Sequence, residues 1–62
     1  LDEERWAELE RLRGECLDYA GQGEEAAGAY ACALAHCPDG ARGERARILR
    51  SRAFLQAKQN AW

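Results

Sequence analysis

The composition and the spacing of apolar residues predict an all-α fold of three helices. Alanine is abundant, whereas the 62 residues include one isoleucine, no valine and no threonine, which favours helix over sheet. In three stretches, apolar residues recur every three or four positions, as they do on one face of a helix. Glycine and proline mark short loops between these stretches, so neighbouring helices must run antiparallel. We therefore expect a helical hairpin with one further antiparallel helix.

The first helix is expected over residues 3–20. Asp2 suits the N-cap position, and Glu3 and Glu4 suit the positive end of the helix dipole. Apolar residues at helical spacing form two adjoining strips on this helix: Trp6, Leu9, Leu12, Cys16, Leu17, Tyr19 and Ala20. Gly21 follows the last periodic residue, where a left-handed glycine usually ends a helix.

The second helix is expected over residues 24–36. Its apolar face consists mostly of small residues: Ala26, Ala27, Tyr30, Ala33 and Leu34. Small side chains let helix backbones approach closely, so we expect this helix to be packed on two sides. Pro38 cannot continue the helix and forces Cys37 out of helical geometry, and Asp39 and Gly40 complete a turn.

The third helix is expected over residues 43–59, with Asn60 as an acceptable left-handed cap. Its apolar residues are Ile48, Leu49, Ala53, Phe54 and Leu55. Five arginines lie between Arg42 and Arg52, mostly on other faces. Ala61 and Trp62 resemble the start of a further element, so we expect the chain to be an excerpt of a longer protein.

The charge of the chain is unevenly distributed along the sequence. Net charge is −2, but residues 1–25 carry nine acids and three bases, whereas residues 26–62 carry two acids and six bases. An acidic chain is a poor candidate for binding nucleic acid, and the arginines are expected to form a solvated face or to pair with the first helix. No apolar run is long enough to span a membrane. We expect neither nucleic acid nor membrane as a partner.

The three cysteines, Cys16, Cys32 and Cys37, do not suggest a disulfide framework. An odd count without a recognisable spacing favours a reducing compartment, and we expect a cytoplasmic protein. Cys16 and Cys32 lie within apolar helical patterns, so we expect both in the core as small hydrophobic residues.

Cys32 and His36 are one helical turn apart, a spacing that metal ligands use. A zinc site would need Cys16 and Cys37 to converge on them as well. Core cysteines and an exposed histidine at the helix end explain the same residues more simply. The sequence contains no glycine-rich phosphate loop, nucleophile elbow or metalloprotease motif. We expect no metal, no cofactor and no enzymatic activity.

The middle of the chain carries a specific pattern of residues. It reads G-x2-L-x8-A-x3-Y-x2-A-x4-P on Gly14, Leu17, Ala26, Tyr30, Ala33 and Pro38. This pattern resembles the tetratricopeptide repeat, a 34-residue helix–turn–helix unit, over residues 7–40. The resemblance implies that Gly14 and Ala26 touch across the hairpin and that Tyr30 and Ala33 face the next helix.

Two positions of the repeat differ from the family pattern. Glu10 and Arg13 stand where the family usually has large apolar residues, and Trp6, one turn before Glu10, is expected to cover the same patch.

Residues 43–60 resemble the first helix of a second repeat. The resemblance rests on Ser51-Arg52-Ala53, Lys58 and Asn60, with about five extra residues between Gly40 and Ala46. Such an insertion followed by Asn-Arg-Ala is typical of the co-chaperone subgroup of the family. The resemblance therefore implies a single repeat-type domain over residues 1–62, a three-helix α-solenoid fragment whose next helix begins just past Trp62.

The family usually binds peptides on the concave face that its first helices line. The resemblance places ten residues there: Glu8, Arg11, Glu15, Asp18, Tyr19, Arg47, Arg50, Ser51, Phe54 and Lys58. The alternative is that these residues form solvated helix faces. We expect a protein-interaction module whose partner is an extended or helical peptide segment.

The co-chaperone subgroup uses a clamp of cations and two asparagines to hold the carboxylate tail of heat-shock chaperones. By resemblance, Arg11 matches the first cation, whereas Glu15 and Ser51 replace the two asparagines. Glu15 would repel the carboxylate of the tail, so we expect weak or no binding of it.

A purely structural role is the remaining alternative, in which the chain joins further repeats or associates with itself. The third helix is expected to have apolar surface on two sides, only one of which can pack on the second helix.

Overall fold

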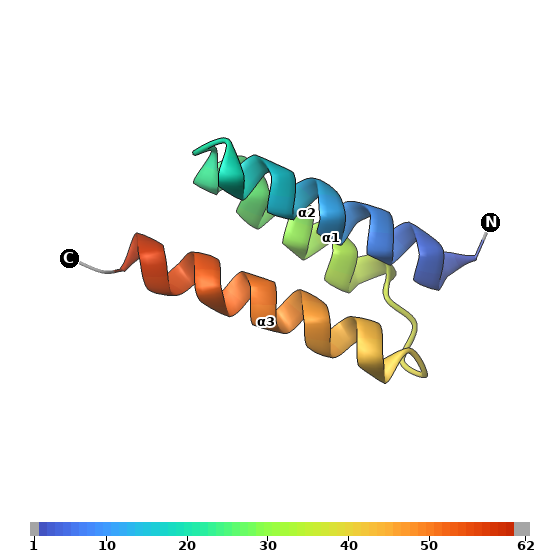
Figure 1. Ribbon diagram of the computed structural model, residues 1–62. Coiled ribbons are helices and arrows are strands. Elements are labelled where there is room, and N and C mark those ends of the chain that lie inside the picture. The colour runs from blue at the N-terminus through green and yellow to red at the C-terminus, as the bar shows by residue number, and fades with distance from the viewer. Residues whose placement is uncertain (1, 61–62) are drawn as a thin grey trace.

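In the computed structural model, residues 2–60 are described, and they form three helices. These are α1 (Glu3–Tyr19), α2 (Gly23–His36) and α3 (Arg42–Gln59). α1 and α2 form an antiparallel hairpin, and α3 returns antiparallel to α2, so that α1 and α3 run in the same direction (Figure 1). The predicted all-α fold is confirmed, and each helix boundary agrees within one residue. Asn60 follows α3 with a φ of −102°, so the left-handed conformation expected of it is wrong. The expectations for Ala61 and Trp62 lie outside the described residues.

The ends of α1 follow the local sequence. The Asp2 carboxylate accepts a hydrogen bond from the backbone N–H of Glu4 at 3.1 Å, which confirms the predicted N-cap. Gly21 has a φ of 81°. Its N–H donates to the carbonyl of Asp18, and the N–H of Gln22 donates to the carbonyl of Leu17. These two bonds form the Schellman motif that a left-handed glycine permits.

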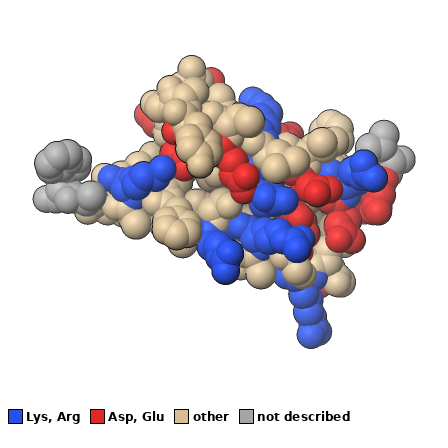
Figure 2. Space-filling model, viewed as in Figure 1, with Lys and Arg blue, Asp and Glu red and all other residues tan. Residues whose placement is uncertain are grey.

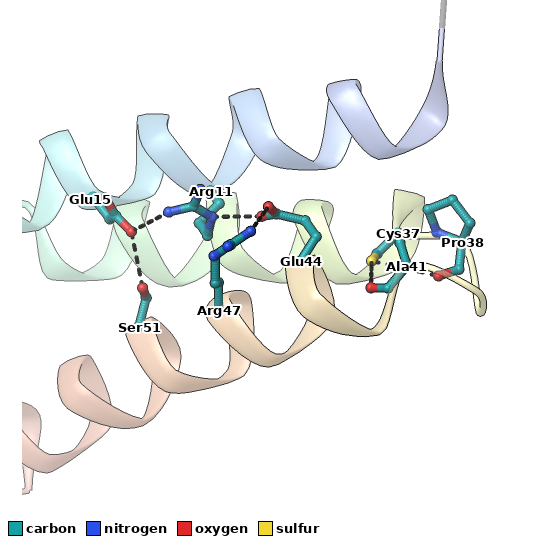
Figure 3. A network of polar contacts seen from close by, with 8 residues as sticks. All are labelled: Arg11, Glu15, Cys37, Pro38, Ala41, Glu44, Arg47 and Ser51. Carbon is teal, nitrogen blue, oxygen red and sulfur yellow. Dashed lines mark hydrogen bonds and ion pairs between the residues drawn. The ribbon is translucent and has the colours of Figure 1, made fainter.

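The loop between α2 and α3 begins at Cys37, as predicted. Its backbone is extended, with φ −74° and ψ 122°, because Pro38 disfavours helical geometry in the residue before it. The thiol of Cys37 is buried and lies 3.7 Å from the carbonyl oxygens of both Pro38 and Ala41 (Figure 3).

The core is built mainly from small residues. Its buried members are Ala7, Ala26, Tyr30, Ala33, Cys37, Ile48 and Leu55. Tyr30 is the largest of them, and its ring covers Gly14 of α1. A Cβ atom at Gly14 would lie only 2.6 Å from Cε1 of Tyr30. Gly14 and Ala26 are both buried, and the three atoms nearest to a Cβ placed at Gly14 all belong to Tyr30.

The apolar strips predicted for α1 lie largely on the outside of the molecule. Trp6, Leu9 and Leu12 are 42–50% exposed, and Tyr19 is 95% exposed. α1 instead packs through Ala7 and Gly14. Only small side chains let the two helix backbones approach closely, so the face with the smallest residues is buried and the larger residues are left outside.

Cys16 and Cys32 are exposed, so the prediction that both lie in the core is wrong. Cys16 follows the buried Gly14 by two residues and Cys32 follows the buried Tyr30 by two. Two residues correspond to about 200° around a helix, which turns each cysteine away from the core. Cys37 is the buried cysteine.

On α3, Ile48 and Leu55 are buried, whereas Leu49, Ala53 and Phe54 are exposed. Three of the five apolar residues predicted for this helix are therefore exposed rather than buried in the core.

Candidate functional site

A cavity of about 570 Å³ lies between α1 and α3, and Tyr30 of α2 forms its floor. It is lined by Glu15, Asp18 and Tyr19 of α1, Tyr30 of α2, and Ser51, Phe54 and Lys58 of α3. The three residues of α3 are spaced three and four apart, which places them on one face of that helix. Acidic and basic side chains lie intermixed along the middle of the molecular face that α1 and α3 share (Figure 2).

Six of the ten residues expected to form a groove line this cavity: Glu15, Asp18, Tyr19, Ser51, Phe54 and Lys58. The structure does not bring Glu8, Arg11, Arg47 and Arg50 into its lining. Sequence reasoning missed Tyr30, which it assigned to the core alone. The hydroxyl of tyrosine could have indicated this role, because it usually reaches a hydrogen-bond partner when the ring is buried.

A chain of polar contacts joins α1 to α3 beside the cavity (Figure 3). Nε of Arg11 donates to Oε2 of Glu44 at 2.6 Å, and Nη1 of Arg11 donates to Oε2 of Glu15 at 2.8 Å. The same oxygen of Glu15 accepts from the hydroxyl of Ser51 at 3.1 Å. Arg47 lies 3.7 Å from the other carboxylate oxygen of Glu44. The network therefore fixes the position of Glu15 on the cavity wall.

The guanidinium of Arg11 is paired with two carboxylates and is not free to bind a ligand. Its side chain is 12% exposed, and that of Glu44 is 3% exposed. Burial acts to lower the pKa of Arg11, but the hydrogen bonds and charges of Glu44 and Glu15 outweigh it and raise the pKa above its ordinary value. Sequence reasoning missed Glu44. Its position one turn before Ile48 places it on the buried face of α3, which could have indicated that it needs a buried partner.

Lys58 and Asp18 form an ion pair across the cavity. Nζ of Lys58 lies 2.7 Å from one carboxylate oxygen of Asp18 and 2.9 Å from the other. The lysine side chain is 60% exposed and the aspartate side chain is 20% exposed. Such an exposed pair contributes little to stability, so it can exchange with other charged groups.

The floor of the cavity lies in a negative field. Burial raises the pKa of Tyr30, and the charges of Glu15 and Asp18 raise it further. The nearby hydroxyl of Ser51 and the charge of Arg11 lower the pKa of Tyr30 without cancelling these effects.

The rim of the cavity carries two exposed aromatic side chains. Tyr19 of α1 is 95% exposed and Phe54 of α3 is 66% exposed. Large aromatic side chains left in solvent at the mouth of a hollow are typical of binding surfaces.

A smaller hollow of about 210 Å³ lies on the outer side of α1, lined by Trp6, Leu9, Glu10 and Arg13. Glu10 and Arg13 form an exposed ion pair at 3.2 Å. Trp6 borders the patch that it was expected to cover, and its ring meets His36 edge-on at 6.0 Å between centroids.

The described residues offer little for metal or thiol chemistry. Among residues 2–60, no three His, Cys, Asp or Glu side chains are grouped so that they could hold a metal ion. Nδ1 of His36 lies 2.9 Å from the backbone carbonyl of Cys32. Burial raises the pKa of Cys37, which makes its thiol a poor nucleophile. In the same part of the chain, no helix has the length and apolar character needed to cross a membrane.

Comparison of the chain with family models, with curated proteins and with solved structures finds no match. A three-helix fold alone is compatible with many functions. The function must therefore be argued from the cavity between α1 and α3.

Proposed function

We propose that this chain is a protein-interaction module that binds a peptide segment of a partner protein in the cavity between α1 and α3. The observation that carries the proposal is the pair of exposed aromatic side chains, Tyr19 and Phe54, on the two helices that flank the cavity. Its volume lies within the range of about 300–1,000 Å³ that is typical of ligand pockets. Covering both rings with a partner removes apolar surface from water, which favours binding.

A peptide suits the chemistry of the cavity because its walls mix apolar and polar groups. Phe54 and Tyr19 can contact apolar side chains, whereas Ser51, Asp18 and Lys58 can pair with amides or charged groups. Binding patches commonly combine aromatic anchors with such polar groups at their edges. The module needs no chemistry of its own for this role.

The resemblance to the tetratricopeptide repeat supports the same proposal. That family binds peptides on the face lined by its first helices, and α1 and α3 stand at those positions in the chain. The clamp for a chaperone tail is less well supported. Arg11, its expected first cation, is already bonded to Glu15 and Glu44, and the carboxylate of Glu15 lies on the cavity wall and opposes another carboxylate.

The test is selection of a random heptapeptide display library on the immobilised 62-residue chain. Enriched peptides are then synthesised, and their affinities for the chain are measured by fluorescence anisotropy. We expect the double change Tyr19→Ser and Phe54→Ser to weaken binding at least about tenfold, since aromatic anchors dominate such interfaces. A peptide ending in Glu-Glu-Val-Asp is measured in parallel and is expected to bind weakly.

The matched control is Leu49→Ser, which removes an exposed apolar side chain of α3 that does not line the cavity. It should leave peptide affinity unchanged, and circular dichroism should show that all variants keep their helices. An unenriched library, or peptides that bind the double variant as well as the original chain, would contradict the proposal.

A further inference from the structure

The cavity between α1 and α3 combines carboxylates with aromatic rings. Asp18 and Glu15 stand on the α1 wall, Tyr30 forms the floor, and Tyr19 and Phe54 flank the mouth. Carboxylates attract a cation directly, and the faces of aromatic rings attract it through their quadrupole. An ammonium or guanidinium group can interact favourably with the carboxylates and with the aromatic rings at the same time.

One cation already occupies the cavity in this structure. Nζ of Lys58 contacts both carboxylate oxygens of Asp18, at 2.7 and 2.9 Å. The lysine comes from α3, 40 residues away in the sequence, and its side chain is 60% exposed. An ammonium held this loosely can leave the aspartate when another cation approaches.

The remaining charges around the cavity favour a cation rather than an anion. Its lining carries the two carboxylates of Glu15 and Asp18 against the single ammonium of Lys58. Arg11 does not line the cavity, and it is held by Glu15 and by the buried Glu44. Burial raises the pKa of Tyr30 at the floor, and the charges of Glu15 and Asp18 raise it further.

We infer that the bound peptide presents a lysine or arginine side chain to this cavity, where it replaces Lys58 on Asp18 between the rings of Tyr19 and Phe54. The inference rests on the proposed function and names the class of peptide that the site takes. Lys58 then acts as an internal competitor, because it must leave Asp18 before the peptide can bind there. A peptide rich in acidic residues is the excluded alternative, since it would need Lys58 and would be repelled by Asp18 and Glu15.

The first readout is the charge of the peptides enriched from the heptapeptide library. We expect lysine or arginine next to an apolar residue to be enriched. Replacing that basic residue with alanine in the synthetic peptide should weaken binding about three- to tenfold. Affinity should also fall as sodium chloride is raised, because salt screens exposed charges.

Two substitutions test the roles of Lys58 and Asp18, and they are expected to change peptide affinity in opposite directions. Lys58→Gln removes the competing ammonium and should tighten binding of the basic peptide about two- to fivefold, whereas Asp18→Asn should weaken it by a similar factor. Arg50→Gln is the matched control, because it removes a basic residue of α3 that does not line the cavity. It should change affinity less than either substitution within the cavity.

The outcomes separate this inference from the proposed function. Enriched peptides that are neutral or acidic, and that lose affinity in the Tyr19→Ser and Phe54→Ser variant, leave the proposed function standing and overturn the inference. Weaker binding of basic peptides by Lys58→Gln overturns it too. A library that yields no peptide defeats the proposed function and the inference together.

Discussion

Gly14 shows how a single position controls the packing of the hairpin. The ring of Tyr30 lies directly over it, so that a Cβ atom there would approach Cε1 at 2.6 Å and Cδ1 at 2.8 Å. Tyr30 is 1% exposed and its ring cannot move away without disturbing the core. The close approach of α1 and α2 therefore depends on the missing side chain.

We expect Gly14→Ala to lower the free energy of unfolding by about 1–2 kcal/mol, because overpacking costs about 1–3 kcal/mol and alanine regains at most about 1 kcal/mol of helix propensity. Gly28→Ala is the matched control, since nothing lies within 4 Å of a Cβ atom there. It should stabilise the chain by about 0.5–1 kcal/mol. Urea unfolding of both variants measures the difference, and equal effects would contradict the packing of Tyr30 on Gly14.

Arg11 and Glu44 form a largely buried ion pair. Removing one partner should lower the free energy of unfolding. We expect Arg11→Met to destabilise the fold by about 3 kcal/mol, because it leaves the carboxylate of Glu44 buried with only the more distant Arg47. Arg13→Met breaks the exposed pair with Glu10 and should cost less than about 1 kcal/mol. Thermal unfolding compares the two variants. Similar losses of stability would show that the buried ion pair of Arg11 is no more important for stability than the exposed pair of Arg13.

The buried thiol of Cys37 predicts sensitivity to alkaline pH. Burial raises its pKa, so the folded chain retains a proton that the unfolded chain releases. The corresponding stability is present below the ordinary thiol pKa, near about 8.5–9, and is lost as the pH rises through the folded pKa. We expect the free energy of unfolding to fall between about pH 8.5 and 10 and to fall less steeply in Cys37→Ala.

Labelling with a thiol reagent provides the control for that experiment. Cys16 and Cys32 are exposed and should react rapidly in the folded chain, whereas Cys37 should react only when the chain opens. Three equally fast thiols would remove the basis for the pH prediction.

Among the helices, α1 depends on its C-terminal cap. Gly21 has a φ of 81° and lets the N–H groups of Gly21 and Gln22 bond to carbonyls of the last turn. Gly21→Ala should cost about 1–2 kcal/mol, because a Cβ atom is strained in the left-handed region. Gly40→Ala, in the other loop and with open space around its Cβ position, is the comparison. Circular dichroism during thermal unfolding should show the larger loss for Gly21→Ala.

α1 also presents two unlike faces to its surroundings. The face that carries Ala7 and Gly14 is buried, and the face that carries Leu9 and Leu12 is half exposed. On α3, Leu49 is likewise 44% exposed. These two helices therefore retain apolar surface that the hairpin and the third helix do not cover.

For the molecule as a whole, this uncovered surface predicts self-association of the 62-residue chain, since soluble monomers rarely expose large apolar patches. Sedimentation equilibrium at several concentrations should show a mass above that of the monomer. Leu9→Lys with Leu12→Lys should reduce association if α1 supplies the contact, and Leu49→Lys should do so if α3 supplies it. A chain that stays monomeric and unfolds cooperatively would show that three helices close the core without a partner.

Much of the candidate site followed from the resemblance to the tetratricopeptide repeat, which assigns the groove to one face of each helix, where helical spacing keeps residues together. Ser51, Phe54 and Lys58 share a face of α3 for this reason, and all three line the cavity. The contribution of Tyr30 to the cavity and the burial of Arg11 were not predicted. Tyr30 packs on Gly14 of α1, and Arg11 pairs with Glu44 of α3, and the sequence does not specify which residues of separate helices meet.

Local residues sufficed to define three helices and their ends, because an N-cap at Asp2, a left-handed Gly21 and a break at Pro38 act on their immediate neighbours. Packing between the helices determined which side of each helix is buried. Two faces of α1 had apolar residues, and the face with Ala7 and Gly14 was buried because small residues permit the closest approach to α2. The same packing exposed Cys16 and brought Lys58 to Asp18, since contacts between distant residues depend on how whole helices fit together.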